Sequence, residues 1–136
     1  MKKTTVAFIC THNSCRSQMA EAISKALAAD IFDSCSAGTS PKPRIDRDAV
    51  RLINARYGID MDKTQRPKST VELPAADIVI TMGCGVECPY IPASRREDWG
   101  LEDPTGRGDD VFAAVIGVIE EKVRLLADSI RKEVEF

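Results

Sequence analysis

The sequence has a single histidine, few aromatic residues and no apolar run long enough for a membrane or a secretory signal. The apolar stretch near the N-terminus covers residues 6–10 and ends at Thr11. A secretory signal needs about 7–15 apolar residues in its core, and a membrane-spanning helix needs about 20. We therefore expect no secretory leader and no membrane partner, and we expect the protein to be cytoplasmic.

The net charge is also small, with 19 basic and 21 acidic side chains and a formal charge of −2. A general nucleic-acid binder carries a basic stripe, so we expect no nucleic-acid partner. A bound anion remains compatible with this charge, because one arginine and a loop of backbone N–H groups hardly change it. With 136 residues, of which 43% are hydrophobic, the chain is expected to fold as one domain over residues 1–136 and to be a monomer.

Cysteine is the residue that is not scarce, with five copies. An odd number of cysteines cannot pair completely within one chain. In a reducing compartment, cysteines serve catalysis, redox chemistry or metal binding more often than structural disulfides. The positions of the cysteines are therefore the main indication of function.

The apolar pattern along the chain alternates between strand and helix. Three short apolar runs predict buried strands, at residues 4–10, 31–36 and 77–82. Helices are predicted from about residue 19 to 29, from a cap at Asp46 to a stop at Gly58, briefly after a capping box at Ser69 and Glu72, and from Asp109 or Asp110 onward. Residues 83–108 are rich in proline and glycine and are expected to form turns.

This alternation predicts an α/β fold, with a four-stranded parallel sheet, helices on both faces and a flavodoxin-like order. In such sheets, ligands bind at the carboxyl ends of the strands. The loops after the first and third predicted strands lie at that edge and carry four of the five cysteines.

The loop after the first strand combines a thiol, an arginine and a helix start. It consists of Cys10, Thr11, His12, Asn13, Ser14, Cys15, Arg16 and Ser17. The backbone N–H groups of residues 11–17 and the helix N-terminus can bind an oxyanion and stabilise a thiolate at Cys10. Asn13 tolerates a left-handed backbone, and the fork of Arg16 suits a tetrahedral oxyanion. The alternative is that Cys10 is only the buried end of a strand and Arg16 a solvated helix residue.

Residues 10–17 resemble the phosphate-binding loop of the low-molecular-weight protein tyrosine phosphatase superfamily. Residues 14–21 are most similar to the thiol-dependent arsenate reductases of that superfamily. The resemblance implies a low-molecular-weight phosphatase-like fold, with Cys10 as the nucleophile and Arg16 as an oxyanion ligand. His12 stands where the superfamily often has glycine, and it is assigned no role as a general base.

A second pair of cysteines, Cys84 and Cys88, follows the third predicted strand. From the residues alone, the pair can form a disulfide, bind zinc with further ligands or be two buried thiols. The resemblance implies a redox relay, in which Cys84 attacks Cys10 and Cys88 then attacks Cys84. It also implies an external dithiol reductant, thioredoxin or a similar donor, and no bound organic cofactor.

Asp103 stands before a proline, which by itself indicates a turn. The resemblance implies that Asp103 is a general acid, with a pKa raised by burial or by the bound anion. Thr105 and Gly106 follow at positions where the phosphatases tend to have aromatic residues, which weighs against a tyrosine phosphatase.

Some relatives bind a potassium ion near the loop, and the resemblance offers oxygen donors for it in Asn13, Glu21 and Ser36. The residues around Thr64 do not match that site. Cys15 is either structural or able to form a protective disulfide with Cys10, and Cys35 is expected to be a packed core thiol.

Three functions follow. The favoured hypothesis is an arsenate reductase with a thiol relay, for which phosphate or sulfate would be competing anions. The second is a phosphomonoester phosphatase that uses Cys10, Arg16 and Asp103. The third is a noncatalytic oxyanion-binding or redox-sensing module.

Overall fold

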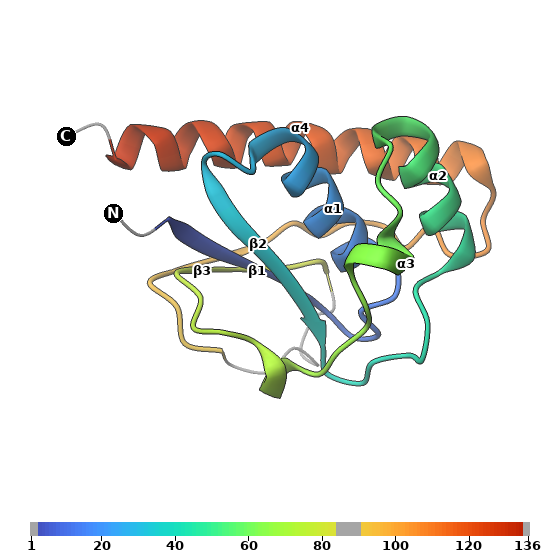
Figure 1. Cartoon of the computed structure of the whole chain (residues 1–136), viewed down its shortest axis with the longest axis horizontal. Helices are drawn as coiled ribbons and strands as arrows, with labels where there is room; N and C mark the ends of the chain where they lie inside the picture. The colour runs from blue at the N-terminus through green and yellow to red at the C-terminus, as the bar shows by residue number, and fades with distance from the viewer. Residues whose placement is uncertain (1–2, 84–90, 135–136) are drawn as a thin grey trace.

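The computed structural model describes residues 3–83 and 91–134. Four parallel strands form one sheet in the order β2-β1-β3-β4 (Figure 1). The strands are β1 (Thr4–Cys10), β2 (Phe32–Gly38), β3 (Ile78–Thr81) and β4 (Arg95–Asp98). The predicted α/β class and the four-stranded parallel sheet are confirmed.

The sequence pattern did not locate β4. Its four residues are all charged and alternate between half-buried and exposed, so they carry no apolar signal. β4 lies at the edge of the sheet beside β3. Charged side chains on an edge strand disfavour pairing with another chain, which is a physical reason for this composition.

The helices are α1 (Arg16–Ala28), α2 (Arg47–Tyr57), α3 (Met61–Thr64) and α4 (Asp109–Val134), with a 3-10 turn η1 (Thr70–Glu72). α3 was not predicted, because four residues are too few to show a helical period. Among the described residues, no helix combines the length and apolar character needed to cross a membrane.

The predicted helix boundaries rest on capping groups that the structure contains. The side chain of Asp46 accepts a hydrogen bond from the Ala49 N–H at 3.0 Å, and Gly58 ends α2 with a φ of 72°. Both halves of the capping box between Ser69 and Glu72 are present at η1. These caps confirm the predicted starts and stops.

The two faces of the sheet are covered unequally (Figure 1). One face packs against α1, α2 and α4 in a single large apolar cluster that includes Phe8, Met19, Ile53 and Phe112. The second face carries a small cluster of Ala7, Ile9, Ala37 and Val79, covered by residues 73–76, which follow η1, and by residues 91–93. Helical cover is therefore heavier on one face than the sequence pattern predicted.

The carboxyl ends of β1 and β3 meet at one edge of the sheet, because Ile9 pairs in register with Thr81. The loop from β1 to α1 and the segment that follows β3 both start at this edge. The expected meeting of these two segments is confirmed for the residues that the structure describes.

Candidate active site

The loop between β1 and α1 is held from outside by its carbonyl groups. Six consecutive carbonyls, those of residues 10–15, each accept a hydrogen bond at 2.8–3.3 Å. The donors, in the order of the carbonyls, are the N–H groups of Thr39, Ser40 and Lys42, the Nε2 of Gln18, and the N–H groups of Asp46 and Met19. With its carbonyls engaged in this way, the loop can present its N–H groups to a ligand.

The N–H side of the loop has a different character. Within the described part of the chain, the N–H groups of Thr11, His12, Ser14 and Cys15 donate to no protein acceptor. The N-cap of α1 provides no side-chain hydrogen bond, and its first turn contains no acidic residue. Unpaired N–H groups and the positive end of a helix dipole together form a site for an anion.

Gly38, at the end of β2, allows the loop to approach the sheet this closely. A Cβ at this position would lie 2.6 Å from the Thr11 carbonyl oxygen and 2.9 Å from the Asn13 nitrogen. A side chain here would therefore displace the backbone of the loop.

The Cys10 sulfur lies at the end of β1, buried beneath the loop. It is 2.8 Å from the Ser17 Oγ and accepts a hydrogen bond from the Asn13 N–H at 3.2 Å. The Ser17 oxygen already accepts from the Asn13 Nδ2 at 2.8 Å, so the Ser17 hydroxyl can direct its hydrogen to the sulfur. Two donors aimed at one sulfur stabilise an anionic nucleophile.

Asn13 is the residue of the loop at which several hydrogen bonds meet. Its φ of 49° confirms the left-handed conformation that the sequence predicted. The buried Gln18 side chain donates to both the carbonyl oxygen and the Oδ1 of Asn13, each at 3.0 Å. A second amide, on Gln65, donates to Gln18 in turn, so the loop conformation is fixed by buried polar contacts.

Arg16 connects the loop to the segments after β3 and β4. Its Nη1 donates to the Met82 carbonyl at 2.9 Å and to the Leu101 carbonyl at 2.8 Å. Among the described residues, the Nε and Nη2 hydrogens of Arg16 meet no acceptor. The guanidinium is therefore held at one nitrogen while the rest of its fork can bind an oxyanion.

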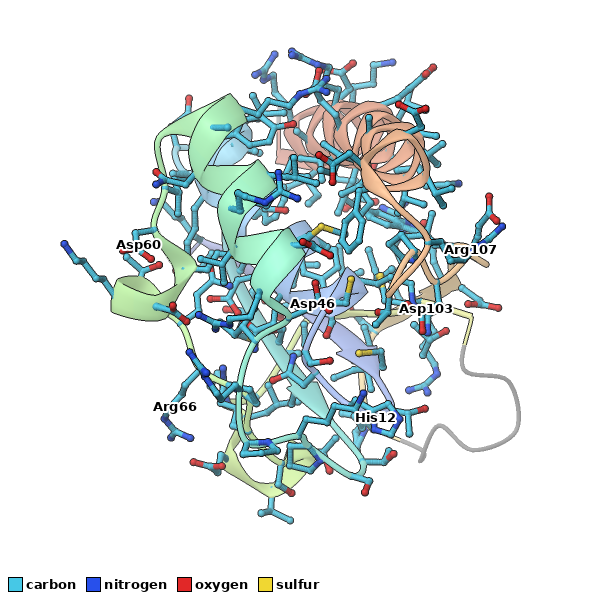
Figure 2. The ribbon with its side chains drawn as sticks, turned by 90° about the vertical axis from the view of Figure 1, so that its right-hand side faces the viewer. His12, Asp46, Asp60, Arg66, Asp103 and Arg107 are labelled. Carbon is cyan, nitrogen blue, oxygen red and sulfur yellow. The ribbon has the colours of Figure 1, made fainter. Side chains whose placement is uncertain are left out.

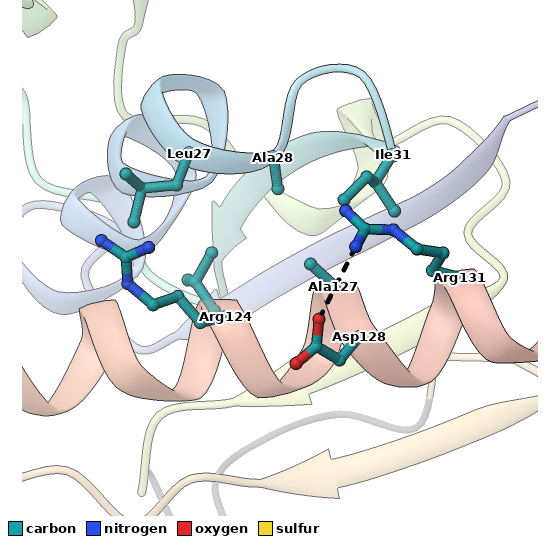
Figure 3. Close-up of a pocket in the computed structure, with 8 residues that line it drawn as sticks. Leu27, Ala28, Ile31, Arg124, Ala127, Asp128 and Arg131 are labelled. Atoms are coloured by element: carbon teal, nitrogen blue, oxygen red, sulfur yellow. Dashed lines mark ion pairs between the residues drawn. The ribbon is translucent and has the colours of Figure 1, made fainter.

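These groups surround a small hollow with a cavity volume of about 30 Å³. Its walls are Cys10, Thr11, His12, Ser14, Cys15, Arg16, Lys42, Asp103 and Thr105. A larger hollow of about 240 Å³ lies between α1 and α4 (Figure 3), where apolar side chains adjoin Arg124 and the pair of Arg131 with Asp128. That larger hollow is lined by no thiol or hydroxyl nucleophile, so we assign the chemistry to the smaller one.

Two residues in the small hollow were not proposed as site residues from the sequence. Lys42 lies in the segment that follows β2, and its N–H donates to the His12 carbonyl at 3.0 Å. Ligands bind at the carboxyl ends of strands, so this segment was also a candidate. It contains no cysteine, and for that reason it was not selected from the sequence. Thr105 contacts Asp103 and Cys15, which its sequence position alone does not reveal.

Asp103, which the resemblance assigned to the site, lines the hollow and lies on the same side of the molecule as His12 (Figure 2). Its Oδ1 accepts from the Thr105 N–H at 3.0 Å and from the Thr105 hydroxyl at 2.7 Å. Partial burial acts to raise the pKa of Asp103, but these hydrogen bonds and the charges of Arg16 and Lys42 outweigh it, so the pKa lies below its usual value. Burial therefore does not raise this pKa on balance, and the raising by a bound anion that the resemblance implies stays a prediction.

The other described thiols differ from Cys10. Burial is the main cause that raises the pKa of Cys15 to about 12 and that of Cys35 to about 11. Both thiols are therefore protonated at neutral pH. Cys35 is only half-buried, and its sulfur donates weakly to the Val6 carbonyl at 3.6 Å, so it packs against the small apolar cluster and not, as expected, within the core.

His12 is exposed at the edge of the hollow, and its Nδ1 lies 3.2 Å from the Ser40 carbonyl oxygen. It contacts no described acid or nucleophile through its ring. Cys84 and Cys88, the two predicted relay thiols, lie outside the described residues. The described chain reaches Gly83 directly after Met82, whose carbonyl binds Arg16.

The oxygen donors suggested for potassium already have other partners. The Glu21 Oε1 accepts from the Ser36 hydroxyl at 2.7 Å, and its Oε2 binds the Lys25 ammonium at 2.5 Å. The Asn13 Oδ1 accepts from the Lys68 N–H and from Gln18, each at 3.0 Å, and Asn13 turns its NH₂ group toward Ser36.

The surface hollow that Glu21 lines has a net positive charge, since Lys63, Arg66 and Lys68 line it together with the carboxylates of Glu21 and Asp62. Its one buried acceptor without a partner among the described residues is the Gln65 Oε1, a neutral oxygen. A potassium ion at the Glu21 carboxylate would have to displace the ammonium of Lys25, and it would lie at a hollow whose three cations outnumber its two carboxylates. The residues present do not fit a bound potassium ion.

Comparisons with known proteins agree with this geometry. The model of a family described as low molecular weight phosphotyrosine protein phosphatase matches residues 5–136. The chain is 38% identical over 130 residues to a glutaredoxin arsenate reductase of Synechocystis sp., covering 93% of this chain and 96% of that protein.

Two solved structures are similar over most of this chain. One is an arsenate reductase in the phosphate binding state, with a TM-score of 0.83 and 36% identity over 93% of this chain and 98% of that one. The other is a thioredoxin-dependent arsenate reductase of Corynebacterium glutamicum, with a TM-score of 0.77 and 32% identity over 97% of this chain and 64% of that one.

Proposed function

We propose that this chain, which belongs to the low molecular weight phosphotyrosine protein phosphatase family, is an arsenate reductase. The observation that carries the proposal is the Cys10 sulfur beneath a loop whose carbonyls are all engaged outside, with Arg16 beside it. This arrangement holds a tetrahedral oxyanion against a thiolate. The relatives named as arsenate reductases favour arsenate over a phosphate ester as the substrate.

In the first step, the Cys10 thiolate attacks arsenic(V) and forms a sulfur–arsenic bond. The loop N–H groups and Arg16 hold the remaining oxygens, while Asp103 protonates the departing hydroxide, which leaves as water. Asp103 needs a proton for this role, and its pKa in the free protein is low. A bound dianion raises the pKa of a neighbouring carboxyl, so substrate binding itself would protonate the acid.

In the second step, the Cys84 thiolate attacks the Cys10 sulfur, and the electron pair of the sulfur–arsenic bond passes to arsenic, which leaves as arsenite. Cys88 then attacks Cys84, which frees the Cys10 thiolate and leaves a Cys84–Cys88 disulfide. Two thiols thus supply the two electrons that arsenic(V) requires. The described chain enters the segment with these cysteines beside Arg16, which is consistent with the proposed relay.

The final electrons come from an external thiol donor, and no bound organic cofactor is required. One relative is named for glutaredoxin and another for thioredoxin, so the assay below compares these two thiol donors. We place the enzyme in the cytoplasm as a monomer, where thiol donors keep its cysteines reduced.

The test is arsenate-dependent oxidation of NADPH, coupled in one arm to thioredoxin and its reductase and in another to glutathione, glutaredoxin and glutathione reductase. Wild type should consume one NADPH per arsenate in at least one arm. Cys84→Ser and Cys88→Ser should lose this activity, whereas Cys35→Ser, the matched control outside the hollow, should retain it.

Mass spectrometry should find a Cys10–Cys84 disulfide accumulating in Cys88→Ser after arsenate is added. Hydrolysis of an aryl phosphate is measured in parallel. If wild type hydrolyses the aryl phosphate and shows no arsenate-dependent oxidation with either donor, the protein is a phosphatase and the proposal is wrong.

A further inference from the structure

A continuous chain of hydrogen bonds runs from the protein surface to the Cys10 sulfur. Its members are Lys25, Glu21, Ser36, Asn13, Ser17 and Cys10, and the five links measure 2.5, 2.7, 3.0, 2.8 and 2.8 Å. Each link between Glu21 and Cys10 is buried. Four residues therefore connect the ammonium group of Lys25, at the surface, to the sulfur of Cys10.

The direction of the hydrogens along this chain follows from chemistry. A carboxylate only accepts, so the Ser36 hydroxyl donates to Glu21 and its oxygen receives the amide hydrogen of Asn13. The second hydrogen of the same Asn13 NH₂ goes to the Ser17 oxygen. The Ser17 hydroxyl is then left to donate to the Cys10 sulfur.

Glu21 is the member of this chain of hydrogen bonds whose burial is energetically unfavourable. Its side chain is only 6% exposed, and a buried carboxylate in the same hydrogen-bond chain as an anionic sulfur is unfavourable unless a cation neutralises it. Lys25, one turn further along α1, supplies that cation at 2.5 Å and is 37% exposed. The oxygen atoms suggested as potassium ligands already have hydrogen-bond partners, as described above. A monovalent metal ion therefore does not fit in the place of the Lys25 ammonium.

We infer that the Lys25 ammonium is the resident counter-cation of Glu21 and that this pair, acting through Ser36, Asn13 and Ser17, keeps Cys10 reactive without any added monovalent metal ion. Lys25 is a positioning residue in this account, since it touches neither Cys10 nor the oxyanion hollow. The inference rests on the proposed role of Cys10 as the nucleophile.

The test measures the rate of Cys10 alkylation by iodoacetamide at pH 7, with the modified peptide identified by mass spectrometry. Potassium chloride is compared with choline chloride at equal ionic strength. Wild type should react at rates within about twofold in the two salts. Lys25→Met should react about three to ten times more slowly in choline chloride, because the uncompensated Glu21 charge disfavours the thiolate.

Two variants separate charge from packing. Lys25→Arg retains the cation and should react like wild type. Lys63→Met removes an equal charge from the hollow that Glu21 lines, without breaking a bond to Glu21, and should also react like wild type. In a Glu21→Gln background, adding Lys25→Met should have no further effect, since no buried charge then needs a partner.

A clear dependence of wild-type alkylation on potassium would overturn the inference, and this measurement needs no variant to fold. Equal alkylation rates in folded Lys25→Met and wild type would also overturn it. If the alkylation results are as expected but arsenate supports no NADPH oxidation, the proposed function fails and the inference stands.

Discussion

At the scale of single residues, the surroundings of Cys10 and Cys15 differ in a way that supports the proposal of Cys10 as the nucleophile. Cys10 and Cys15 both line the hollow and are both at least 95% buried. The Cys10 sulfur receives donors from Ser17 and Asn13, whereas burial and two nearby carboxylates raise the pKa of Cys15 to about 12. The hydrogen bonds at the two sulfurs, and not the exposure of the side chains, distinguish the two thiols.

This difference predicts selective alkylation. Below about pH 10, Cys15 stays protonated because its pKa is about 12, so its alkylation rate should rise tenfold per pH unit and remain small at pH 7. Iodoacetamide at pH 7 should modify Cys10 at least tenfold faster than Cys15, as measured by mass spectrometry of the peptides. Faster modification of Cys15 would contradict the assignment of the nucleophile.

Asp103 gives a second prediction at this scale. Asp103→Asn cannot donate a proton to the departing hydroxide, so the first chemical step should slow by about 10²–10⁴-fold. Affinity for phosphate should stay within a few-fold of wild type or increase, because a carboxylate no longer faces the anion. Single-turnover arsenate reduction and phosphate titration measure the two quantities. Glu102→Gln, at the neighbouring carboxylate that pairs with Arg107, is the control and should leave the first step unchanged.

At the scale of elements, the sequence predicted what local chemistry determines. Asp46 and Gly58 bound α2 as expected, and the loop proposed to bind the oxyanion lies where the first predicted strand ends. β4 and α3 escaped prediction, because one consists of charged edge residues and the other is too short. Lys42 also escaped, since its approach to the hollow depends on hydrogen bonds between the segment after β2 and the loop.

Gly38 provides a prediction about the contact between β2 and the loop. In Gly38→Ala the new Cβ would lie 2.6 Å from the Thr11 carbonyl oxygen, so backbone must move. We expect the free energy of unfolding to fall by about 1–3 kcal/mol and phosphate affinity to fall with it. Denaturant unfolding and phosphate titration measure both effects.

Gly117, within α4, is the contrasting glycine. A Cβ at this position meets no described atom within 4 Å, and the backbone is helical. Gly117→Ala should therefore raise the free energy of unfolding by about 0.5–1 kcal/mol through helix propensity, with phosphate affinity unchanged. A loss of phosphate affinity in this variant would show that α4 influences the loop in a way the contacts do not indicate.

At the scale of the whole molecule, the site joins segments that are distant in sequence. Arg16 donates hydrogen bonds to the carbonyls of Met82 and Leu101. The Lys68 N–H donates to Asn13, and the Thr105 side chain contacts Cys15. The sequence motif identified the loop and the resemblance identified Asp103, but neither could show these long-range contacts. They arise from the parallel direction of the neighbouring strands, which brings the carboxyl ends of β1, β2, β3 and β4 to one edge.

This architecture predicts that an oxyanion stabilises the entire fold. An anion that binds only the folded chain at one hundred times its Kd raises the free energy of unfolding by about 2.7 kcal/mol. Phosphate should therefore raise the Tm of wild type by several degrees at constant ionic strength, whereas chloride should not. In Arg16→Lys, which loses the planar fork and its two carbonyl contacts, the rise should largely disappear. Arg56→Lys, on α2 and outside the hollow, should respond like wild type, and an equal phosphate response in both variants would place the anion away from this loop.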